Sequence, residues 1–141
     1  MKETNEIKVM YIPGGTEPTI VEIENSMESF SELVNGNEPI MPFISNELTG
    51  LGIQIVAGTD ADKQGLCPSV VVYDEVTDTG VVIWGDMFFV GVNDSNEYVS
   101  LNVEQAVFLA DRILYGEFEF IHKKTNEKRK VVTFKCSIDI E

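Results

Sequence analysis

The residues that come closest to a metal-binding pattern are Asp60, Asp62 and Gln64, which are followed by Gly65. A calcium loop of the EF-hand type has oxygen ligands at positions 1, 3 and 5 and glycine at position 6, so the segment matches the first half of such a loop. The loop also requires a glutamate at position 12, where this chain has Val71. We therefore interpret the segment as a solvent-exposed turn and expect no metal site.

The residues needed for nucleophilic catalysis are not grouped in this sequence. His122 is the only histidine, and it stands beside two lysines instead of beside a nucleophile and an orienting carboxylate. Cys67 and Cys136 are far apart, and neither belongs to a Cys-x-x-Cys motif. One histidine and two separated cysteines are also too few ligands for a structural zinc site. We expect two reduced thiols and no catalytic residue.

Phosphate-binding loops and catalytic carboxylates give no clearer signal. The glycine-rich segment Pro13-Gly14-Gly15-Thr16 lacks the lysine and the spacing of a P-loop. Neighbouring carboxylates are frequent, but 24 acidic residues in 141 produce such pairs by chance. The sequence therefore predicts a protein that is not an enzyme and that holds no cofactor.

Charge is distributed unequally along the chain, whose net charge is −14. The first 111 residues contain 19 acidic residues against Lys2, Lys8 and Lys63, and the remaining 30 contain seven basic residues against five acidic ones. A strongly acidic body repels nucleic acid and attracts basic protein surfaces. We expect no direct binding to duplex nucleic acid.

Most of the C-terminal basic residues gather in one short cluster. The cluster consists of Lys123, Lys124, Lys128, Arg129 and Lys130. It either contacts an anion such as a phosphate or pairs with acidic side chains of the body or of a second subunit, and the sequence leaves both interpretations open.

Targeting and membrane segments are not evident. The first six residues are polar, and no apolar run approaches the ~18 residues that span a bilayer. A hydrophobic content of 43% is normal for a globular protein, so the acidity does not indicate disorder. We expect a cytoplasmic protein without a membrane partner.

The N-terminal part predicts a β-hairpin and a helix. Residues 6–12 alternate in hydrophobicity, and after the glycine-rich turn residues 20–23 begin a second strand. Asn25 has the spacing of a capping box with the glutamate three positions later, and apolar residues then recur at helical intervals. Gly36 provides a left-handed stop. We predict a helix over 26–35.

The rest of the body predicts short strands and a second helix. The predicted strands cover residues 39–44, 53–57, 70–73, 81–92 and 98–101. The strand over 81–92 is interrupted by Gly85 and Gly91, where we expect a bulge or a close approach of the backbone. Residues 58–69 are predicted to be a loop. Asn102 and Gln105 form a capping box that opens a helix over 102–115, ended by Gly116. Every other element is expected to be strand or loop.

Residues 117–141 alternate between apolar and polar positions on both sides of the basic cluster, which predicts an amphipathic β-hairpin with a basic tip. We predict an α+β fold, in which a bent, mostly antiparallel sheet with two helices is closed by this C-terminal β-hairpin. Residues 1–141 are expected to form a single domain, with the hairpin packed on the acidic body of residues 7–116.

Self-association is suggested by Phe88 and Phe89, which are adjacent in a predicted strand and must point to opposite faces. Either both faces are covered, or one phenylalanine is exposed and marks a contact surface. A homo-oligomer is consistent with the second case.

Three parts of the sequence, taken in order, resemble a known family. They are YIPGGTEP (11–18) with VEIEN (21–25), then GLCP (65–68) with YDE (73–75) and IWGDMFFVG (83–91), and finally YVSL (98–101) with Glu104 and Gln105. Over about residues 7–114 the chain is similar to small proteins catalogued as domain of unknown function 3846. The resemblance implies an origin in a phage, plasmid or conjugative element, and it implies no established activity. Residues 117–141 and a longer segment around 45–64 depart from the family pattern.

Two functional hypotheses follow. The leading one is an acidic interaction protein of a mobile genetic element, which inhibits a host nucleic-acid-handling or defence protein because its carboxylates imitate a row of phosphates. The candidate partner-binding residues are Glu22, Glu24, Glu28, Glu32, Asp74 and Glu75. The alternative is a module that binds or sequesters a small molecule or nucleotide between the sheet and residues 45–69. Acidity that only keeps the protein soluble is the competing explanation.

Overall fold

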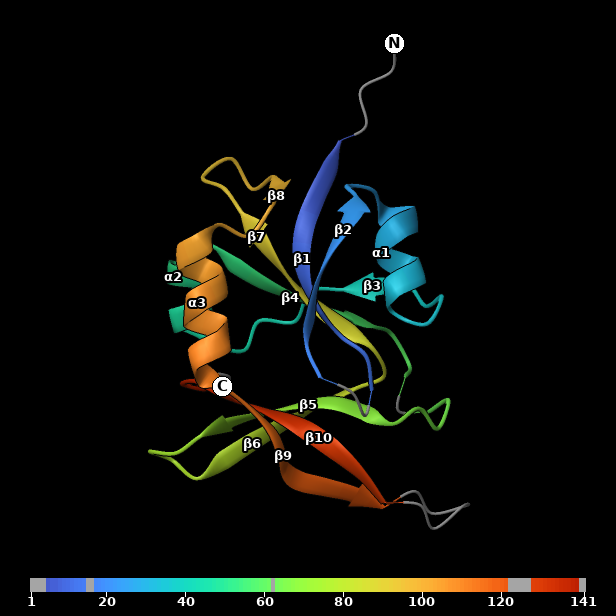
Figure 1. The fold of residues 1–141 in the computed structure, drawn as a ribbon, viewed down its shortest axis with the longest axis vertical. Coiled ribbons are helices and arrows are strands. Elements are labelled where there is room, and N and C mark those ends of the chain that lie inside the picture. Colours follow the sequence, from blue (N-terminus) through green and yellow to red (C-terminus); the bar gives the residue numbers. More distant parts are fainter. Residues whose placement is uncertain (1–4, 15–16, 62, 122–127, 140–141) are drawn as a thin grey trace.

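The computed structural model describes residues 5–14, 17–61, 63–121 and 128–139, and for 115–121 and 128–130 it describes the backbone alone. This part of the chain forms ten strands and three helices (Figure 1). In chain order they are β1 Glu6–Ile12, β2 Thr19–Glu24, α1 Met27–Leu33, β3 Pro39–Ile40, α2 Asn46–Gly50, β4 Ile53–Gly58, β5 Pro68–Asp74, β6 Thr79–Trp84, β7 Met87–Val92, β8 Tyr98–Val99, α3 Val103–Arg112, β9 Ile113–Ile121 and β10 Lys128–Lys135.

The strands are divided between two sheets, which lie one above the other in Figure 1. The first sheet has the strand order β2-β1-β7-β4-β3, with β8 added to β7, and all its pairs are antiparallel. The second has the order β6-β5-β10-β9, and only β5 and β10 are parallel. The predicted α+β class, the mostly antiparallel pairing and the C-terminal strand pair are confirmed, although the strands form two sheets instead of one bent sheet.

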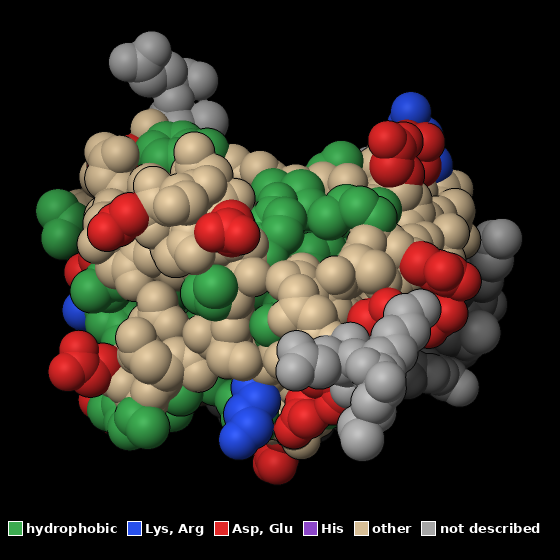
Figure 2. Space-filling model, turned by 90° about the horizontal axis from the view of Figure 1, so that it is seen from above, with side chains coloured by type: hydrophobic (Ala, Val, Ile, Leu, Met, Phe, Trp, Pro, Cys, Tyr) green, Lys and Arg blue, Asp and Glu red, His purple; other side chains and the backbone are tan. Residues whose placement is uncertain are grey.

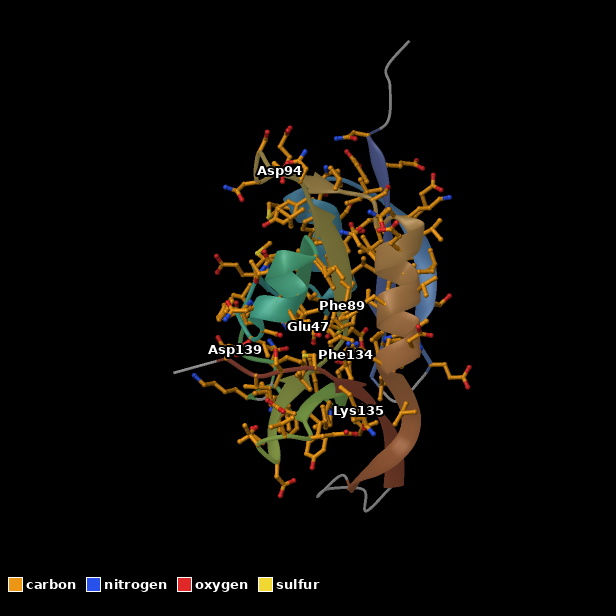
Figure 3. The ribbon with its side chains drawn as sticks, turned by 90° about the vertical axis from the view of Figure 1, so that its left-hand side faces the viewer. Glu47, Phe89, Asp94, Phe134, Lys135 and Asp139 are labelled. Atoms are coloured by element: carbon orange, nitrogen blue, oxygen red, sulfur yellow. The ribbon has the colours of Figure 1, made fainter. Side chains whose placement is uncertain are left out.

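Hydrophobic cores lie on both faces of the first sheet. On one face Phe30 of α1 packs edge-on against Phe88, with the ring centroids 5.1 Å apart. On the other face Phe89 meets Phe134 of β10, with the centroids 5.2 Å apart, so this core joins the two sheets (Figure 3). Phe88 and Phe89 are both fully buried. Both faces are therefore covered, and neither phenylalanine offers a contact surface.

The first helix is present, but its start was predicted wrongly. The N-cap is Ser26, whose Oγ accepts a hydrogen bond from the Ser29 N–H at 3.1 Å. Asn25 Nδ2 instead donates to the Tyr98 carbonyl at 2.9 Å, so a contact with β8 replaces the predicted capping box. At the other end Gly36 has φ 73°, which is the left-handed stop that the sequence predicted.

The strand predicted over 81–92 is two strands, β6 and β7, because the chain turns sharply at Gly85, one of the two glycines where an interruption was expected. Gly85 has φ 72°, and β6 before it and β7 after it belong to different sheets. A side chain at this position would meet Asn35 Oδ1 at 2.8 Å. Glycine is required here both for the backbone conformation and for the close approach.

Three further differences from the predicted elements occur, at α2, β3 and the end of α3. The structure contains α2 (Asn46–Gly50), where only strands and loops were expected, and it reduces the strand predicted over 39–44 to β3. The capping box of Asn102 with Gln105 is confirmed, yet α3 ends at Arg112 and not at residue 115. Ile113 pairs with Phe134 of β10, so strand pairing overrides the helical periodicity.

Residues 117–121 and 128–135 form the predicted antiparallel strand pair, and no helix occurs in the described part of 117–141. Of the predicted basic tip, residues 123–130, residues 123–127 lie outside the described residues, and residues 128–130 belong to β10 instead of to a turn. Residues 136–139 are not part of a strand, although the alternating pattern continued to residue 140. In the described part of the chain, none of the helices has the length and apolarity required to cross a membrane.

Candidate functional site

Three carboxylates gather on the open face of the β1–β2 hairpin. In the antiparallel register Glu24 lies opposite Glu6, and Glu22 lies opposite Lys8, so these side chains share one face. Hydrogen bonding to Glu22, together with the negative charges of Glu22 and Glu24, raises the pKa of Glu6 above its usual value. We call Glu6, Glu22 and Glu24 the acidic strand face. Because β2 is an outer strand, this face lies at the edge of the sheet.

Glu28 and Glu32 lie on the other side of β2. Ile7 and Val9 of β1 point toward α1, whereas Met10 points to the opposite face of the sheet. Because side chains alternate along a strand, Lys8 and its partner Glu22 point to the same face as Met10. The exposed Glu28 and Glu32 are on α1. The four glutamates therefore flank one sheet edge from two sides. Figure 2 shows acidic side chains in separate groups on this face of the molecule, with a hydrophobic area between them.

Asp74 and Glu75 lie apart from these glutamates, at a concavity of about 270 Å³ between β5, β10 and the helices α2 and α3. Asp74 is 7% exposed, and its carboxylate accepts hydrogen bonds from the Ile138 N–H at 3.1 Å and the Val76 N–H at 2.9 Å. The hydrogen bond from Ile138 is the main reason why the pKa of Asp74 is lowered. Asp74 thus anchors the C-terminal segment to the β5–β6 turn instead of presenting a charge to a partner.

The charged groups around this concavity pair with one another. Arg112 Nη1 donates to Glu47 Oε1 at 3.2 Å, and its guanidinium lies 4.4 Å from the centre of the Phe108 ring. Lys135 forms an ion pair with Glu75. Carboxylates and cations therefore line one hollow. The phosphates of a nucleotide would need the two cations, but both are already engaged by carboxylates.

Asp86 connects the parts of the chain that carry the family resemblance. Its carboxylate accepts hydrogen bonds from Tyr11 Oη and from the Gly14 N–H, both at 2.8 Å. A Cβ at Gly14 would lie 3.3 Å from the Cys67 carbonyl oxygen, so the segments around residues 11–18, 65–68 and 83–91 meet at this point. Burial and the hydrogen bond to Asp86 raise the pKa of Tyr11 to about 12. These contacts assign structural roles to the motif residues.

The Tyr11–Asp86 contact predicts an alkaline transition. Because the folded-state pKa of Tyr11 is raised from 10.0 to about 12, its contribution to stability is complete below pH ~10 and is lost as the pH rises through ~12. Wild-type protein should show a tyrosine ionisation near pH 12 in the ultraviolet absorbance of phenolate, and Tyr11→Phe should lack it. Loss of the ionisation near pH 10 instead of the one near pH 12 in Tyr11→Phe would contradict the assignment.

The structure describes both cysteines and part of the residues that were considered for metal binding. Cys67 and Cys136 are free thiols, and burial raises the pKa of Cys136 to about 11, so this thiol stays protonated at neutral pH. Among the described residues, no group of three or more His, Cys, Asp or Glu side chains is placed to hold a metal ion. Asp62 and His122 lie outside the described residues.

The basic cluster is only partly covered by the structure. Lys123 and Lys124 lie outside the described residues, and Lys128, Arg129 and Lys130 belong to β10 by their backbone. Contact of this cluster with an anion stays a prediction.

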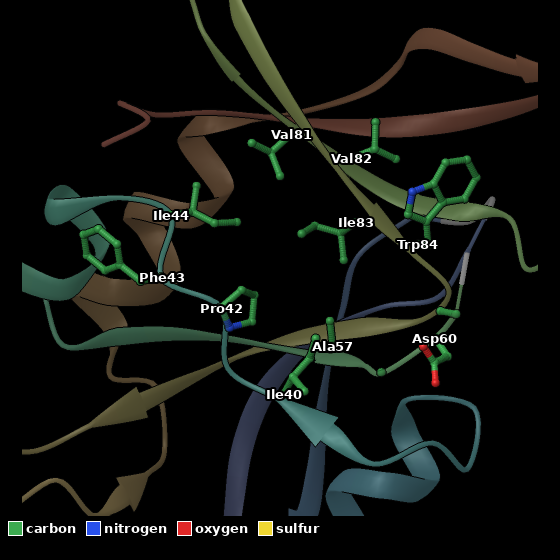
Figure 4. Close-up of a pocket in the computed structure, with 12 residues that line it drawn as sticks. Ile40, Pro42, Phe43, Ile44, Ala57, Asp60, Val81, Val82, Ile83 and Trp84 are labelled. Atoms are coloured by element: carbon green, nitrogen blue, oxygen red, sulfur yellow. The ribbon is translucent and has the colours of Figure 1, made fainter. Parts of the chain in front are cut away.

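Sequence reasoning missed an apolar groove of about 310 Å³ between β6 and residues 40–44. Val81, Ile83 and Trp84 of β6 form one side, and Ile40, Pro42, Phe43 and Ile44 form the other, with Trp84 and Phe43 at opposite ends (Figure 4). Phe43 and Ile40 are 50% and 43% exposed. The apolar run over 39–44 was the available signal, but it was interpreted as a strand.

Comparison with known proteins identifies the family. The model of the family described as Domain of unknown function (DUF3846) matches residues 7–116, which is most of the chain and agrees with the range of the resemblance. Neither the curated proteins nor the solved structures include a significant match. Residues 117–141, which include β10, follow the matched region. The chain therefore belongs to the DUF3846 family.

Proposed function

We propose that this protein is a non-enzymatic interaction protein, which docks on a basic surface of another protein. The docking surface would be the acidic edge at β2, by which we mean the acidic strand face together with Glu28 and Glu32 of α1. The observation that carries the proposal is the acidic strand face, where the strand register brings Glu6 beside Glu22 and Glu24, and where the hydrogen bond to Glu22 and the charges of both glutamates raise the pKa of Glu6. Like charges held this close repel one another in the free protein, and a cationic surface would relieve the repulsion on binding. Glu28 and Glu32, on the other side of β2, extend the contact.

The proposed partner is a host protein that handles nucleic acid, such as a defence nuclease. A cleft built for nucleic acid already presents lysine and arginine side chains to a row of phosphates, so a row of carboxylates fits the same cleft. Binding would block the cleft and inhibit the partner. The net charge of −14 supports fast association with such a surface. The role in a mobile genetic element rests on the family resemblance and is part of the proposal.

The alternative function, binding or sequestering a small molecule or nucleotide, would use the concavity that holds Asp74. It is the weaker proposal, because Arg112 and Lys135 already pair with Glu47 and Glu75 and an anionic ligand would have to displace them.

Charge reversal tests the proposal. The variant Glu22→Lys, Glu24→Lys, Glu28→Lys, Glu32→Lys should lose the partner, which is identified by capture from a host lysate and then purified for affinity measurements. The matched control reverses four other exposed acids, Glu38, Asp94, Glu104 and Asp111, so both variants change the net charge equally. The control should bind nearly as wild type does. Both variants should melt close to the wild-type temperature, because exposed carboxylates contribute little to stability.

Salt provides the second measurement. Exposed charges are screened within ~10 Å at 0.1 M salt, so the affinity of the wild-type complex should fall steeply as salt is added. Equal losses in the two variants would show that the acidity acts only as bulk charge. An affinity that does not change with salt would refute the docking proposal and favour the ligand-binding alternative.

A further inference from the structure

We propose that the groove along β6 binds an extended peptide segment of a partner protein, which adds to β6 as a further strand of the second sheet. The segment would carry apolar side chains in its middle and lysine or arginine on either side of them. This second docking site is independent of the acidic edge at β2, because β6 lies in the other sheet (Figure 1).

The geometry places the groove along the edge of β6 and not over one of its faces. Residues 81–84 are consecutive, and all four line the groove. Successive side chains of a strand point to opposite faces, so a cavity that touches four residues in a row must follow the side of the strand, where the backbone is accessible. In the second sheet β6 is the outermost strand, paired with β5 on its other side.

The edge of β6 lacks the features that normally prevent strands from pairing with other chains. Its sequence, Thr79–Trp84, contains no charged residue and no proline. Other outer strands have such features: β2 carries Glu22 and Glu24, and β3 is two residues long and begins with proline. Ile40, Phe43 and Val82 add exposed apolar surface, each between 41% and 50% exposed. An apolar, unprotected edge beside a groove fits strand addition.

The charges at the ends of the groove indicate the chemistry of the segment. Asp60 lines the end at Trp84, where its ion pair with Lys63, 3.5 Å long, is largely exposed and therefore weak. At the other end Asp78 directly precedes Thr79, the first residue of β6. The floor between these ends is apolar, with Ile44, Ala57 and Ile83. Basic residues would thus face acids at both ends, while apolar side chains fill the groove.

The same charges argue against a second copy of this chain in the groove. Two copies paired through β6 would bring the acids at the groove ends together, and each copy carries a net charge of −14. The same negative charge that makes two copies repel each other attracts a basic, apolar segment of another protein.

The test uses a displayed library of random 12-residue peptides, selected against the wild-type protein. Enriched peptides should alternate apolar residues and carry flanking lysine or arginine. The double variant Ile40→Lys, Phe43→Lys should weaken their binding tenfold or more. The matched control Val103→Lys, Val107→Lys changes two exposed apolar residues of α3 and should leave the affinity within about twofold of wild type. The variant Glu22→Lys, Glu24→Lys, Glu28→Lys, Glu32→Lys should still bind the peptides. This result would separate peptide binding at β6 from docking through the acidic edge at β2.

Backbone pairing is tested with the best peptide from that selection. Strand pairing uses the N–H groups of alternate residues, so N-methylation of one alternate set should abolish binding, and methylation of the other set should be tolerated. Equal tolerance of both sets would overturn strand addition in favour of simple apolar binding. The proposal also fails if no peptide is enriched, or if sedimentation shows a dimer of the free protein that the Ile40→Lys, Phe43→Lys variant abolishes.

Discussion

Replacing Phe89 with alanine should lower the free energy of unfolding by about 3–5 kcal/mol, which is a large part of the total stability of a domain. Phe89 is fully buried on β7 and contacts Phe134 of β10 in the other sheet. The substitution leaves a cavity in the core that joins the two sheets, and neither sheet can move to fill it without losing its own pairing. Urea unfolding followed by Trp84 fluorescence measures the loss.

A double-mutant cycle extends this test. Phe134→Ala should cost about as much as Phe89→Ala, and the double variant should cost less than the sum by roughly 0.5–1.5 kcal/mol, because the ring–ring contact is lost only once. Phe43→Ala is the control, since Phe43 is 50% exposed and its loss should matter little. If Phe89→Ala were as mild as Phe43→Ala, the two sheets would not share a core.

Gly91→Ala should also destabilise the protein, by about 1–3 kcal/mol or more. A Cβ at Gly91 would lie 2.9 Å from the carbonyl oxygens of both Val99 and Ser100, which are backbone atoms. The β8 segment cannot retreat easily, because the Leu101 N–H donates to the Lys8 carbonyl and the Lys8 N–H donates to Ser100 Oγ, both at 2.9 Å. The added methyl group must therefore displace β8 from β7.

Gly50→Ala is the matched control for Gly91→Ala. No atom lies within 4 Å of a Cβ at Gly50, which is the last residue of α2. Alanine there should be neutral or slightly stabilising, since it reduces the entropy of the unfolded chain. Thermal melting of the two variants compares the same chemical change with and without a backbone clash. Similar melting temperatures would mean that β8 is held only loosely.

The sequence by itself determined the elements whose signals are local. Alternating hydrophobicity over residues 6–12, the glycine-rich turn and the apolar residues at 20–23 predicted the hairpin of β1 and β2, because these signals all lie within about 20 residues of one another. The capping box of Asn102 and Gln105 formed as predicted, since its two hydrogen bonds join residues three positions apart. Order and spacing of short motifs were also sufficient to indicate the family.

Tertiary structure decided the elements in which a distant contact competes with a local signal. Asn25 bonds to Tyr98 instead of capping α1, and Ile113 pairs with Phe134 instead of continuing α3. Apart from Gly85, nothing in the local sequence of residues 81–92 indicates that the two halves of this segment join different sheets. The periodicity of hydrophobic residues shows which side of a strand is buried, but it does not show which strand lies beside it.

The candidate sites follow the same division. The sequence placed Glu22 and Glu24 on one face of a strand, but only the register of β1 against β2 brought Glu6 opposite Glu24 and made a group of three carboxylates. The apolar groove depends entirely on tertiary structure, since its two sides come from residues about 40 positions apart and from different sheets. The charge of an acidic residue is known from the sequence alone, whereas a cavity forms only where the packing of elements leaves space between them.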